Sequence, residues 1–383
     1  MKRTELPPSL ARVLKPSLIV GAGALLACAV GGIVNARRFF ESYLAAYLLF
    51  LGIALGSNAM LMVHQLVGGN WGRLVRRLQE AAAASLPLMA LLFIPILFGL
   101  PDLYPWADSR HAGDPLFQLR RPYLNPPFFL ARAAVYFAIW IVAAWLMRRW
   151  ANHYEENGQT RYYTRLQRLS AGGLVLYVFT VSFAAVDWIM SREPQWFSTI
   201  IGFLVVAGQA LSGMAAVVLL LALVVREEPL AGAASRQDFN DLGNILLTLV
   251  ILFSYMAFVQ FLIQWYGNTQ EDIAYYVPRM RGGWAWVGAM LIVFHFFVPF
   301  FLLLVRFNKR RVRILGAICA LLLFMRLVDN VWLIVPSGQG TVHWTLIASV
   351  LGIGGVWLAT FLYLLGTRPL LAQRDPAMVE DGS

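Results

Sequence analysis

The chain has 383 residues, of which 59% are hydrophobic and only 13% are charged. A soluble domain carries about 25% charged residues, so this composition excludes a soluble globular protein. Apolar runs long enough to cross a bilayer core, which takes about 20 residues, recur along the chain and predict a polytopic membrane protein. Basic loops on one membrane face explain the net charge of +11, so the charge does not require nucleic acid as a partner.

We predict an all-α membrane protein with one ten-helix transmembrane domain over residues 17–366, between an N-terminal segment (1–16) and a C-terminal tail (367–383). Residues 18–34 imitate a secretory or lipoprotein signal, but cleavage there would leave an odd number of spans. The predicted helices are 17–35, 40–66, 81–100, 127–148, 168–189, 197–225, 240–267, 283–305, 312–334 and 342–366.

Lysine and arginine are unequally shared between the loops on the two sides of the membrane. The two terminal segments and the loops on their side carry 21 of the 31 basic residues, whereas the other five loops carry 8. The positive-inside rule therefore predicts that both termini are cytoplasmic, with RFNKRRVR (306–313) as the strongest marker.

Tryptophans show the opposite skew, toward the predicted outer interface. An aromatic belt explains them, and a docking surface for an extramembrane partner is the alternative. They are Trp106, Trp188, Trp196, Trp265, Trp284, Trp286, Trp332 and Trp344.

Two charged residues, Arg326 and Asp329, lie in the outer half of the span 312–334. Because a charge at the membrane centre costs about 3 kcal/mol on insertion scales, each is expected to have a partner. A separation of three residues lets the two side chains meet on one helical face. A neutralised pair within the helix is one interpretation. A proton or quinone site, with Asp329 as the titrating group, is the other.

The span 168–189 contains a second acid, Asp187, on a stripe of small and polar residues that includes Tyr177 and Thr180. Such a stripe is typical of tight helix packing, and it also suits a face that lines hydrated space leading to Asp187. Three polar residues of other spans fall at a similar depth: Arg132, Gln260 and Gln264.

The remaining polar candidates lie deeper or toward the cytoplasmic side. His64 and Ser57 share a face of the span 40–66. His295 is followed four residues later by Pro299, which cannot donate a hydrogen bond to the His295 carbonyl. This spacing predicts either a plain proline kink or a water site beside the imidazole. Gln209 and Ser212 are further candidates at mid-depth.

No metal or haem site is predicted. No CxxC or CxxCH motif occurs, Cys28 and Cys319 fall inside spans, and His64 and His295 differ in depth by several helical turns. Electrons therefore have no evident carrier on this chain, and quinone and lipid are the ligands that we expect.

Six stretches combine apolar spans with distinctive loops, and a short RDP motif (374–376) follows them. They are YLLFLGIALGSNAMLMVHQLVGGNWG (47–72), LFIPILFGLPDLYPWA (92–107), VSFAAVDWIMSREPQWFSTIIGF (181–203), FSYMAFVQFLIQWYGNTQED (253–272), RLVDNVWLIVP (326–336) and HWTLIASVLGIGGVWLATFLYLL (343–365). Together they resemble the ActF subunit of bacterial alternative complex III, a quinol:cytochrome c or quinol:acceptor oxidoreductase. ActF is similar to ActC and to NrfD- and PsrC-type membrane subunits.

This resemblance covers nearly the whole chain and implies ten helices, with helices 2–5 and 6–9 forming two four-helix bundles in a bacterial inner membrane. It also implies partners: an ActC-like membrane subunit, a multihaem cytochrome, an iron–sulfur subunit related to molybdopterin oxidoreductases, a monohaem cytochrome c and small membrane subunits. Within the family, quinol oxidation is assigned to ActC, whereas ActF is proposed to conduct protons. Menaquinone or ubiquinone is the implied quinone.

Four functions therefore stay open. The chain is expected to be a non-redox membrane subunit that conducts protons and anchors redox subunits. Binding of quinone at the outer-half polar residues is the first alternative, and it needs an apolar cleft beside an acid or a histidine. A pure scaffold is the next. A secondary transporter is disfavoured, because the sequence has no inverted repeat and no paired broken helices.

Overall fold

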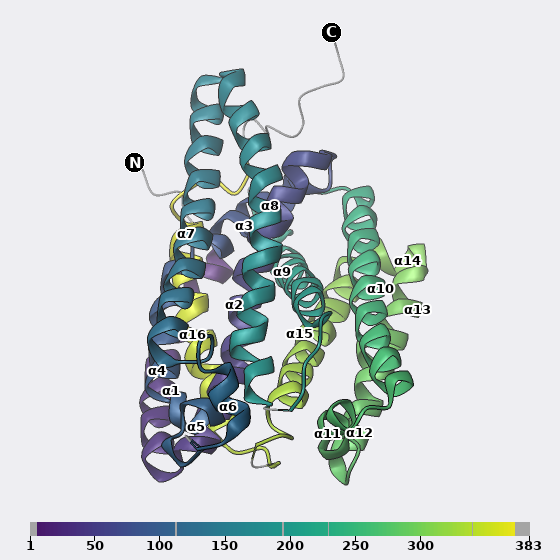
Figure 1. Ribbon diagram of the computed structural model, residues 1–383. Coiled ribbons are helices and arrows are strands. Elements are labelled where there is room, and N and C mark those ends of the chain that lie inside the picture. Colours follow the sequence, from purple (N-terminus) through teal and green to yellow (C-terminus); the bar gives the residue numbers. More distant parts are fainter. Residues whose placement is uncertain (1–5, 112, 194, 229, 339, 372–383) are drawn as a thin grey trace.

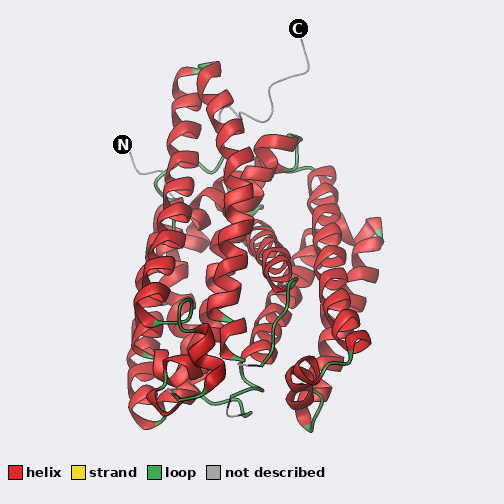
Figure 2. Cartoon of the chain, in the orientation of Figure 1, coloured by secondary structure: helices red, strands yellow, loops and turns green. Residues whose placement is uncertain are grey.

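The computed structural model describes residues 6–111, 113–193, 195–228, 230–338 and 340–371. Within these ranges every regular element is a helix (Figure 2). Nine of the described helices are long and apolar enough to cross a membrane, or ten if the bent pair α3 and α4 forms one span. The prediction of an all-helical polytopic membrane protein is confirmed at this level.

The helices that correspond to the ten predicted spans are α1 (Pro8–Val34), α2 (Ala36–Val67), α3 (Gly72–Ala83) with α4 (Leu86–Phe98), α7 (Pro126–Asn157), α8 (Thr160–Trp188), α9 (Ile201–Val224), α10 (Arg236–Gly267), α12 (Gly283–Met290) with α13 (Val298–Leu304), α15 (Val312–Ile334) and α16 (Thr345–Leu365). The shorter elements are α5 (Leu100–Leu103), α6 (Pro115–Arg120), α11 (Gln270–Arg279), α14 (Arg306–Lys309) and the single turns Pro105–Ala107, Ser109–His111 and Met190–Arg192.

Several helices extend beyond their predicted ends. The helix α1 already begins within the predicted N-terminal segment, at Pro8. The helices α7 and α8 continue past the apolar runs into a polar hairpin, which turns at Gly158 in the left-handed conformation (φ 63°) that glycine adopts without strain. Most of the predicted C-terminal tail, residues 372–383, lies outside the described residues, as does the RDP motif.

The predicted span 81–100 is replaced by two helices joined at an angle of 40°. The bend falls at Ser85, whose hydroxyl donates to the Ala82 carbonyl (2.6 Å) and accepts from the indole of Trp357 (2.9 Å). Pro87 lies in the first turn of α4 and has no N–H to donate to the end of α3, so a single straight helix cannot form.

A second irregularity interrupts the span that contains His295. The turn Leu291–Phe297, between α12 and α13, is π-helical, and the Val298 N–H bonds to the Val293 carbonyl, five residues back. Pro299 follows at once and cannot donate to the His295 carbonyl. The helix therefore widens into a π-helical turn at this point. The sequence predicted either a proline kink or a water site here. Single π-helical turns of this kind often mark functional positions.

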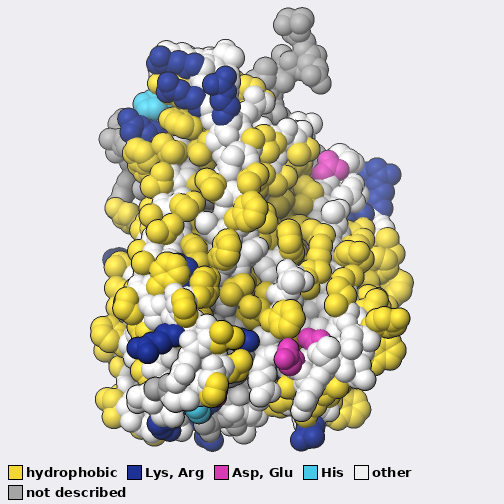
Figure 3. All heavy atoms as spheres, in the orientation of Figure 1, with side chains coloured by type: hydrophobic (Ala, Val, Ile, Leu, Met, Phe, Trp, Pro, Cys, Tyr) yellow, Lys and Arg dark blue, Asp and Glu magenta, His cyan; other side chains and the backbone are white. Residues whose placement is uncertain are grey.

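Successive spans run in alternating directions through an elongated bundle (Figure 1). We call the end that holds the first residues of α1 and the last residues of α16 the terminal face, and the other end the opposite face. A broad band of hydrophobic side chains covers the middle of the visible surface, while Lys and Arg gather at the tip of the α7–α8 hairpin, on the terminal face (Figure 3).

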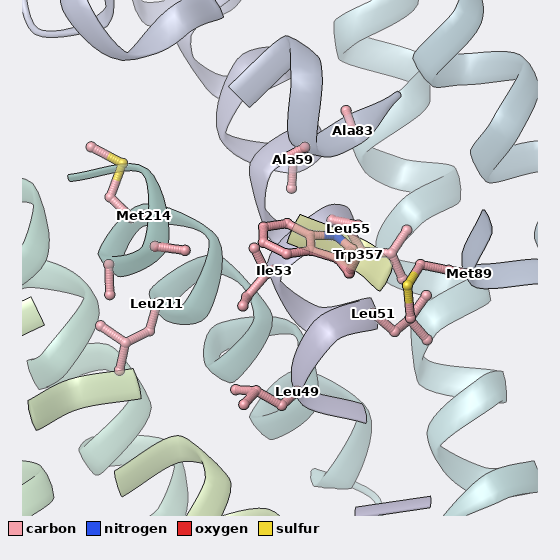
Figure 4. Packing of buried hydrophobic residues seen from close by; sticks show 14 of the residues in the cluster. Leu49, Leu51, Ile53, Leu55, Ala59, Ala83, Met89, Leu211, Met214 and Trp357 are labelled. Carbon is pink, nitrogen blue, oxygen red and sulfur yellow. The ribbon is translucent and has the colours of Figure 1, made fainter. Parts of the chain in front are cut away.

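The helices α2 and α9 cross at the centre of the molecule. A Cβ on Gly56 would lie 1.8 Å from the Gln209 carbonyl oxygen, and one on Gly213 would lie 2.4 Å from the backbone nitrogen of Ser57, so only glycine permits this approach. Small residues serve the same purpose at many transmembrane helix contacts. Around the crossing, hydrophobic side chains from α2, α4, α9 and α16 fill the interior (Figure 4).

The tryptophans predicted at the outer interface occupy two different environments. Trp265 and Trp286 are exposed on the surface of the chain, as an aromatic belt requires. Trp188 and Trp196 are buried instead, and the ring of Trp196 stacks on Tyr275 with centroids 3.9 Å apart. These two therefore belong to the internal packing of the opposite face.

Candidate functional site

The charged residues of α15 form an ion pair within one helical turn. Arg326 Nη1 lies 2.6 Å from Asp329 Oδ2, and Arg326 Nε lies 3.4 Å from Ser212 Oγ on α9. The guanidinium also lies over the ring of Phe253 on α10, 4.6 Å from its centroid. Arg326 is buried, whereas 21% of the Asp329 side chain is exposed. The acid is thus paired, and part of its side chain reaches the surface of the chain.

Gly208 on α9 provides the space for this guanidinium. A Cβ at this position would lie 2.5 Å from Arg326 Nη2. The Ser212 hydroxyl donates to the Gly208 carbonyl (2.8 Å), so its oxygen is oriented as an acceptor toward Arg326. The sequence of α9 therefore shapes a socket for a charged side chain from α15.

His295 is the neighbour of this pair in the π-helical turn. Its ring is buried, packs against Phe253 (centroids 4.7 Å apart) and interacts electrostatically with Arg326. Its Nε2 has no hydrogen-bond partner among the described residues. Since buried polar atoms are normally hydrogen-bonded, an unpartnered imidazole nitrogen beside an ion pair is a position for water or for an exchanging proton.

The second acid, Asp187 at the end of α8, lies in a different kind of site. Arg132 on α7 binds it with both Nε and Nη2 at 2.8 Å, and the Tyr136 hydroxyl donates to Oδ2 at 2.9 Å. The third guanidinium nitrogen of Arg132 donates to the Tyr123 carbonyl (2.8 Å). Only 1% of the Asp187 side chain is exposed. The acceptor positions of this carboxylate are largely used, so it is held as a structural ion pair.

The structure therefore places the predicted polar residues in separate groups. His295, Arg326, Asp329 and Ser212 gather among α9, α10, α15 and the π-helical turn Leu291–Phe297, whereas Arg132 and Asp187 join α7 to α8. Within the described part of the chain, no hydrogen bond or ion pair connects the two acids. Of the two acids, Asp329 is the one whose side chain is partly exposed, and its partner Arg326 also contacts Ser212.

Tyr177, Thr180 and Gln209 make hydrogen bonds between neighbouring helices. The Tyr177 hydroxyl donates to Gln209 Oε1 (2.9 Å), which ties α8 to α9. The Thr180 hydroxyl accepts from the indole of Trp140 on α7 (2.8 Å) and donates to the backbone of its own helix. The small and polar stripe of α8 is thus a packing surface in this structure.

The two remaining predicted pairs, Gln260 with Gln264 and His64 with Ser57, lie in separate parts of the molecule. Gln260 Oε1 accepts from Ser198 (3.2 Å), and Gln264 Nε2 lies 3.5 Å from the Phe197 carbonyl, so both amides fasten the loop before α9. His64 Nε2 lies 2.9 Å from the Gly69 carbonyl at the end of α2. Ser57 is fully buried at the glycine crossing, where its backbone lies against Gly213.

Sequence reasoning missed a buried charge network on the opposite face. Arg192 pairs with Glu41 (3.5 Å) and donates to the Ile334 carbonyl (2.7 Å), while Arg279 pairs with Glu193 (3.3 Å) and donates to the Leu333 carbonyl (2.8 Å). Charge counting treated both arginines as ordinary loop residues. Glu41 and Arg192 lie 151 positions apart, so no spacing rule links them.

An open cleft of about 250 Å³ lies on the opposite face, lined by Tyr123 and Val186, which are neighbours of the Arg132–Asp187 pair. Apolar side chains form most of its wall, including Val186, Met190 and Phe197. Tyr123 and Ser191 line it as well, and the Ser191 hydroxyl donates to the Asp187 carbonyl (2.5 Å). Its lining is that of a site for a small apolar ligand, while its volume is below the roughly 300 Å³ at which most ligand pockets begin.

The described residues contain no group of three or more His, Cys, Asp or Glu side chains that could hold a metal ion. Comparison with known proteins adds no assignment: no protein-family model matches the chain, and no curated protein matches it.

Proposed function

We propose that this chain is a membrane subunit of a quinol-oxidising electron-transfer complex, that it has no redox centre of its own, and that it exchanges protons at Asp329 and His295. The observation that carries the proposal is a partly exposed acid of α15 that is paired with Arg326, together with an unpartnered His295 nitrogen; Arg326 and His295 pack on the same ring, that of Phe253. A membrane-embedded ionisable group costs about 3 kcal/mol, so such a group is retained for function by default.

The resemblance to ActF-type subunits supports the rest of the proposal. It suggests two four-helix bundles (helices 2–5 and 6–9), cytoplasmic termini, a bacterial inner membrane and the redox partners that accompany ActF. The packing of α9 against α10 and α15 is compatible with the second bundle. The basic hairpin tip on the terminal face favours a cytoplasmic position for that face.

Co-purification tests the proposal directly. An affinity-tagged chain extracted gently from its native membrane is expected to bring down haem-bearing subunits, seen as reduced-minus-oxidised haem absorbance in the eluate. A variant of the exposed hairpin residue Glu156, Glu156→Gln, serves as a handling control and should recover the same haem. Recovery of the chain without any haem protein would contradict the proposal.

The cleft on the opposite face favours a second candidate, quinone binding by this subunit. Its apolar wall suits a quinone ring, and it adjoins the buried Arg132–Asp187 pair. A photoreactive quinone is then expected to label residues 186–197, mapped by peptide mass spectrometry. An excess of unlabelled quinone should suppress this labelling. Labelling confined to another subunit would assign quinone binding to that subunit.

A further inference from the structure

The polar half of the bent span forms a charged cluster on the terminal face. Arg76 on α3 pairs with Glu80 (3.0 Å) and with Glu155 on α7 (2.9 Å). Arg77 pairs with the same two carboxylates, with 2.6 Å to Glu80 Oε2. All four side chains are largely buried. The two guanidinium groups are therefore matched by two carboxylates, and these four side chains together carry no net charge.

Among the described residues, two further arginines approach the same cluster without a carboxylate of their own. Arg368, just after α16, reaches only Glu80 Oε2, at 3.4 Å, which Arg77 already occupies. Arg148 on α7 donates to the neutral hydroxyl of Thr367 (2.7 Å). Burial lowers the pKa of Arg368 to about 10, and the attraction of Glu80 offsets this only in part. The group of six side chains thus carries two positive charges in excess.

These two arginines face a common pocket. Arg77, Glu80, Arg148 and Arg368 line it together with Leu364 and Leu365. Its enclosed space, about 10 Å³, holds about one water molecule, and its mouth opens to the surface. One wall is thus basic and another is apolar. Arginine guanidinium groups bind phosphate with paired, charge-assisted hydrogen bonds.

The pocket also lies where lipid headgroups would be found. Arg368 follows the end of the last apolar helix, Leu365, by three residues. On α7, Trp145 lies one turn before Arg148 and is 53% exposed, with the guanidinium of Arg149 5.0 Å from its ring centroid. Exposed tryptophan beside arginine is typical of a membrane–water interface. An acyl chain can therefore lie along α7 and α16 while its phosphate lies at the mouth of the pocket.

We propose that Arg148 and Arg368 bind the phosphate of an anionic membrane lipid at the mouth of this pocket. Basic pockets between transmembrane helices on the cytoplasmic side are suited to such headgroups. The site is independent of the proton exchange proposed above, because it lies at the opposite end of the bundle from Asp329 and shares no residue with it.

The test uses the full chain in nanodiscs of phosphatidylcholine, with or without phosphatidylglycerol or cardiolipin. We expect the anionic lipids to raise the unfolding temperature and to remain bound in native mass spectrometry. The double variant Arg148→Gln/Arg368→Gln should bind them about tenfold more weakly or worse, because hydrogen bonds to charged groups are lost. The control Arg161→Gln/Arg165→Gln removes the same charge from exposed positions of the hairpin and should bind normally.

Three results decide the matter. Equal retention of anionic lipid by the double variant and by the control would overturn the site. Inorganic phosphate could instead raise the unfolding temperature in pure phosphatidylcholine while nanodiscs that contain anionic lipid show none of it retained. That result would overturn the lipid as the natural ligand of the site. The double variant Arg148→Lys/Arg368→Lys keeps the charge and covers the case in which the glutamine variant folds poorly. If it unfolds in phosphatidylcholine like the wild type and binds anionic lipid, the result would support the proposal.

Discussion

Replacement of Asp187 by alanine is expected to lower the free energy of unfolding by about 3–5 kcal/mol. The change removes the carboxylate that Arg132 binds at two points. Among the described residues it leaves a buried guanidinium with the Tyr123 carbonyl as its hydrogen-bond acceptor and with the rings of Tyr123 and Phe128. The Tyr136 hydroxyl loses its acceptor as well. Thermal unfolding of the chain in detergent, followed by the loss of helical circular dichroism, measures the effect.

Two matched variants separate this effect from the simple loss of an acid. Glu156→Ala removes a carboxylate whose side chain is 70% exposed, and it should change the free energy of unfolding by less than about 0.5 kcal/mol. The double variant Arg132→Leu/Asp187→Leu removes both charges, and it should recover much of the loss because no unpaired charge remains. An Asp187→Ala protein that unfolds at the wild-type temperature would show that the pair has no structural role.

Replacement of Asp329 by asparagine is expected to leave the complex assembled but to lower the number of protons translocated per electron. Asparagine keeps the shape of the side chain and can still accept a hydrogen bond from Arg326, but it cannot take up and release a proton. The assay is quinol oxidation by the purified complex in sealed vesicles, with a trapped pH-sensitive dye and with electron flow normalised to haem.

The variant Asp187→Asn provides the comparison. Asp187 is almost completely buried and its oxygens are bound by Arg132 and Tyr136, so proton coupling in the assembled complex should match that of wild type. A ratio of protons to electrons that is unchanged in Asp329→Asn would remove this acid from the mechanism. The His295–Arg326–Asp329 group would then be a packing element of α15.

The positions of the membrane-spanning helices followed from sequence alone, because a bilayer core demands about 20 apolar residues and leaves few alternatives to a helix. The approach of Arg326 to Asp329 was also predictable, since residues three apart meet on one helical face. Pro299 indicated an irregularity near His295, although the sequence did not distinguish a kink from a π-helical turn.

Tertiary structure alone decided how each buried charge is compensated. Arg132 and Asp187 are 55 residues apart, and Glu41 and Arg192 are 151 apart, so the contacts depend on how neighbouring helices are rotated and crossed. Apolar spans are hydrophobic on most of their surface, and their periodicity therefore does not determine that rotation. Close packing at glycines such as Gly56 and Gly208 constrains it instead. In the resulting structure Asp187 is enclosed, whereas part of the Asp329 side chain is exposed.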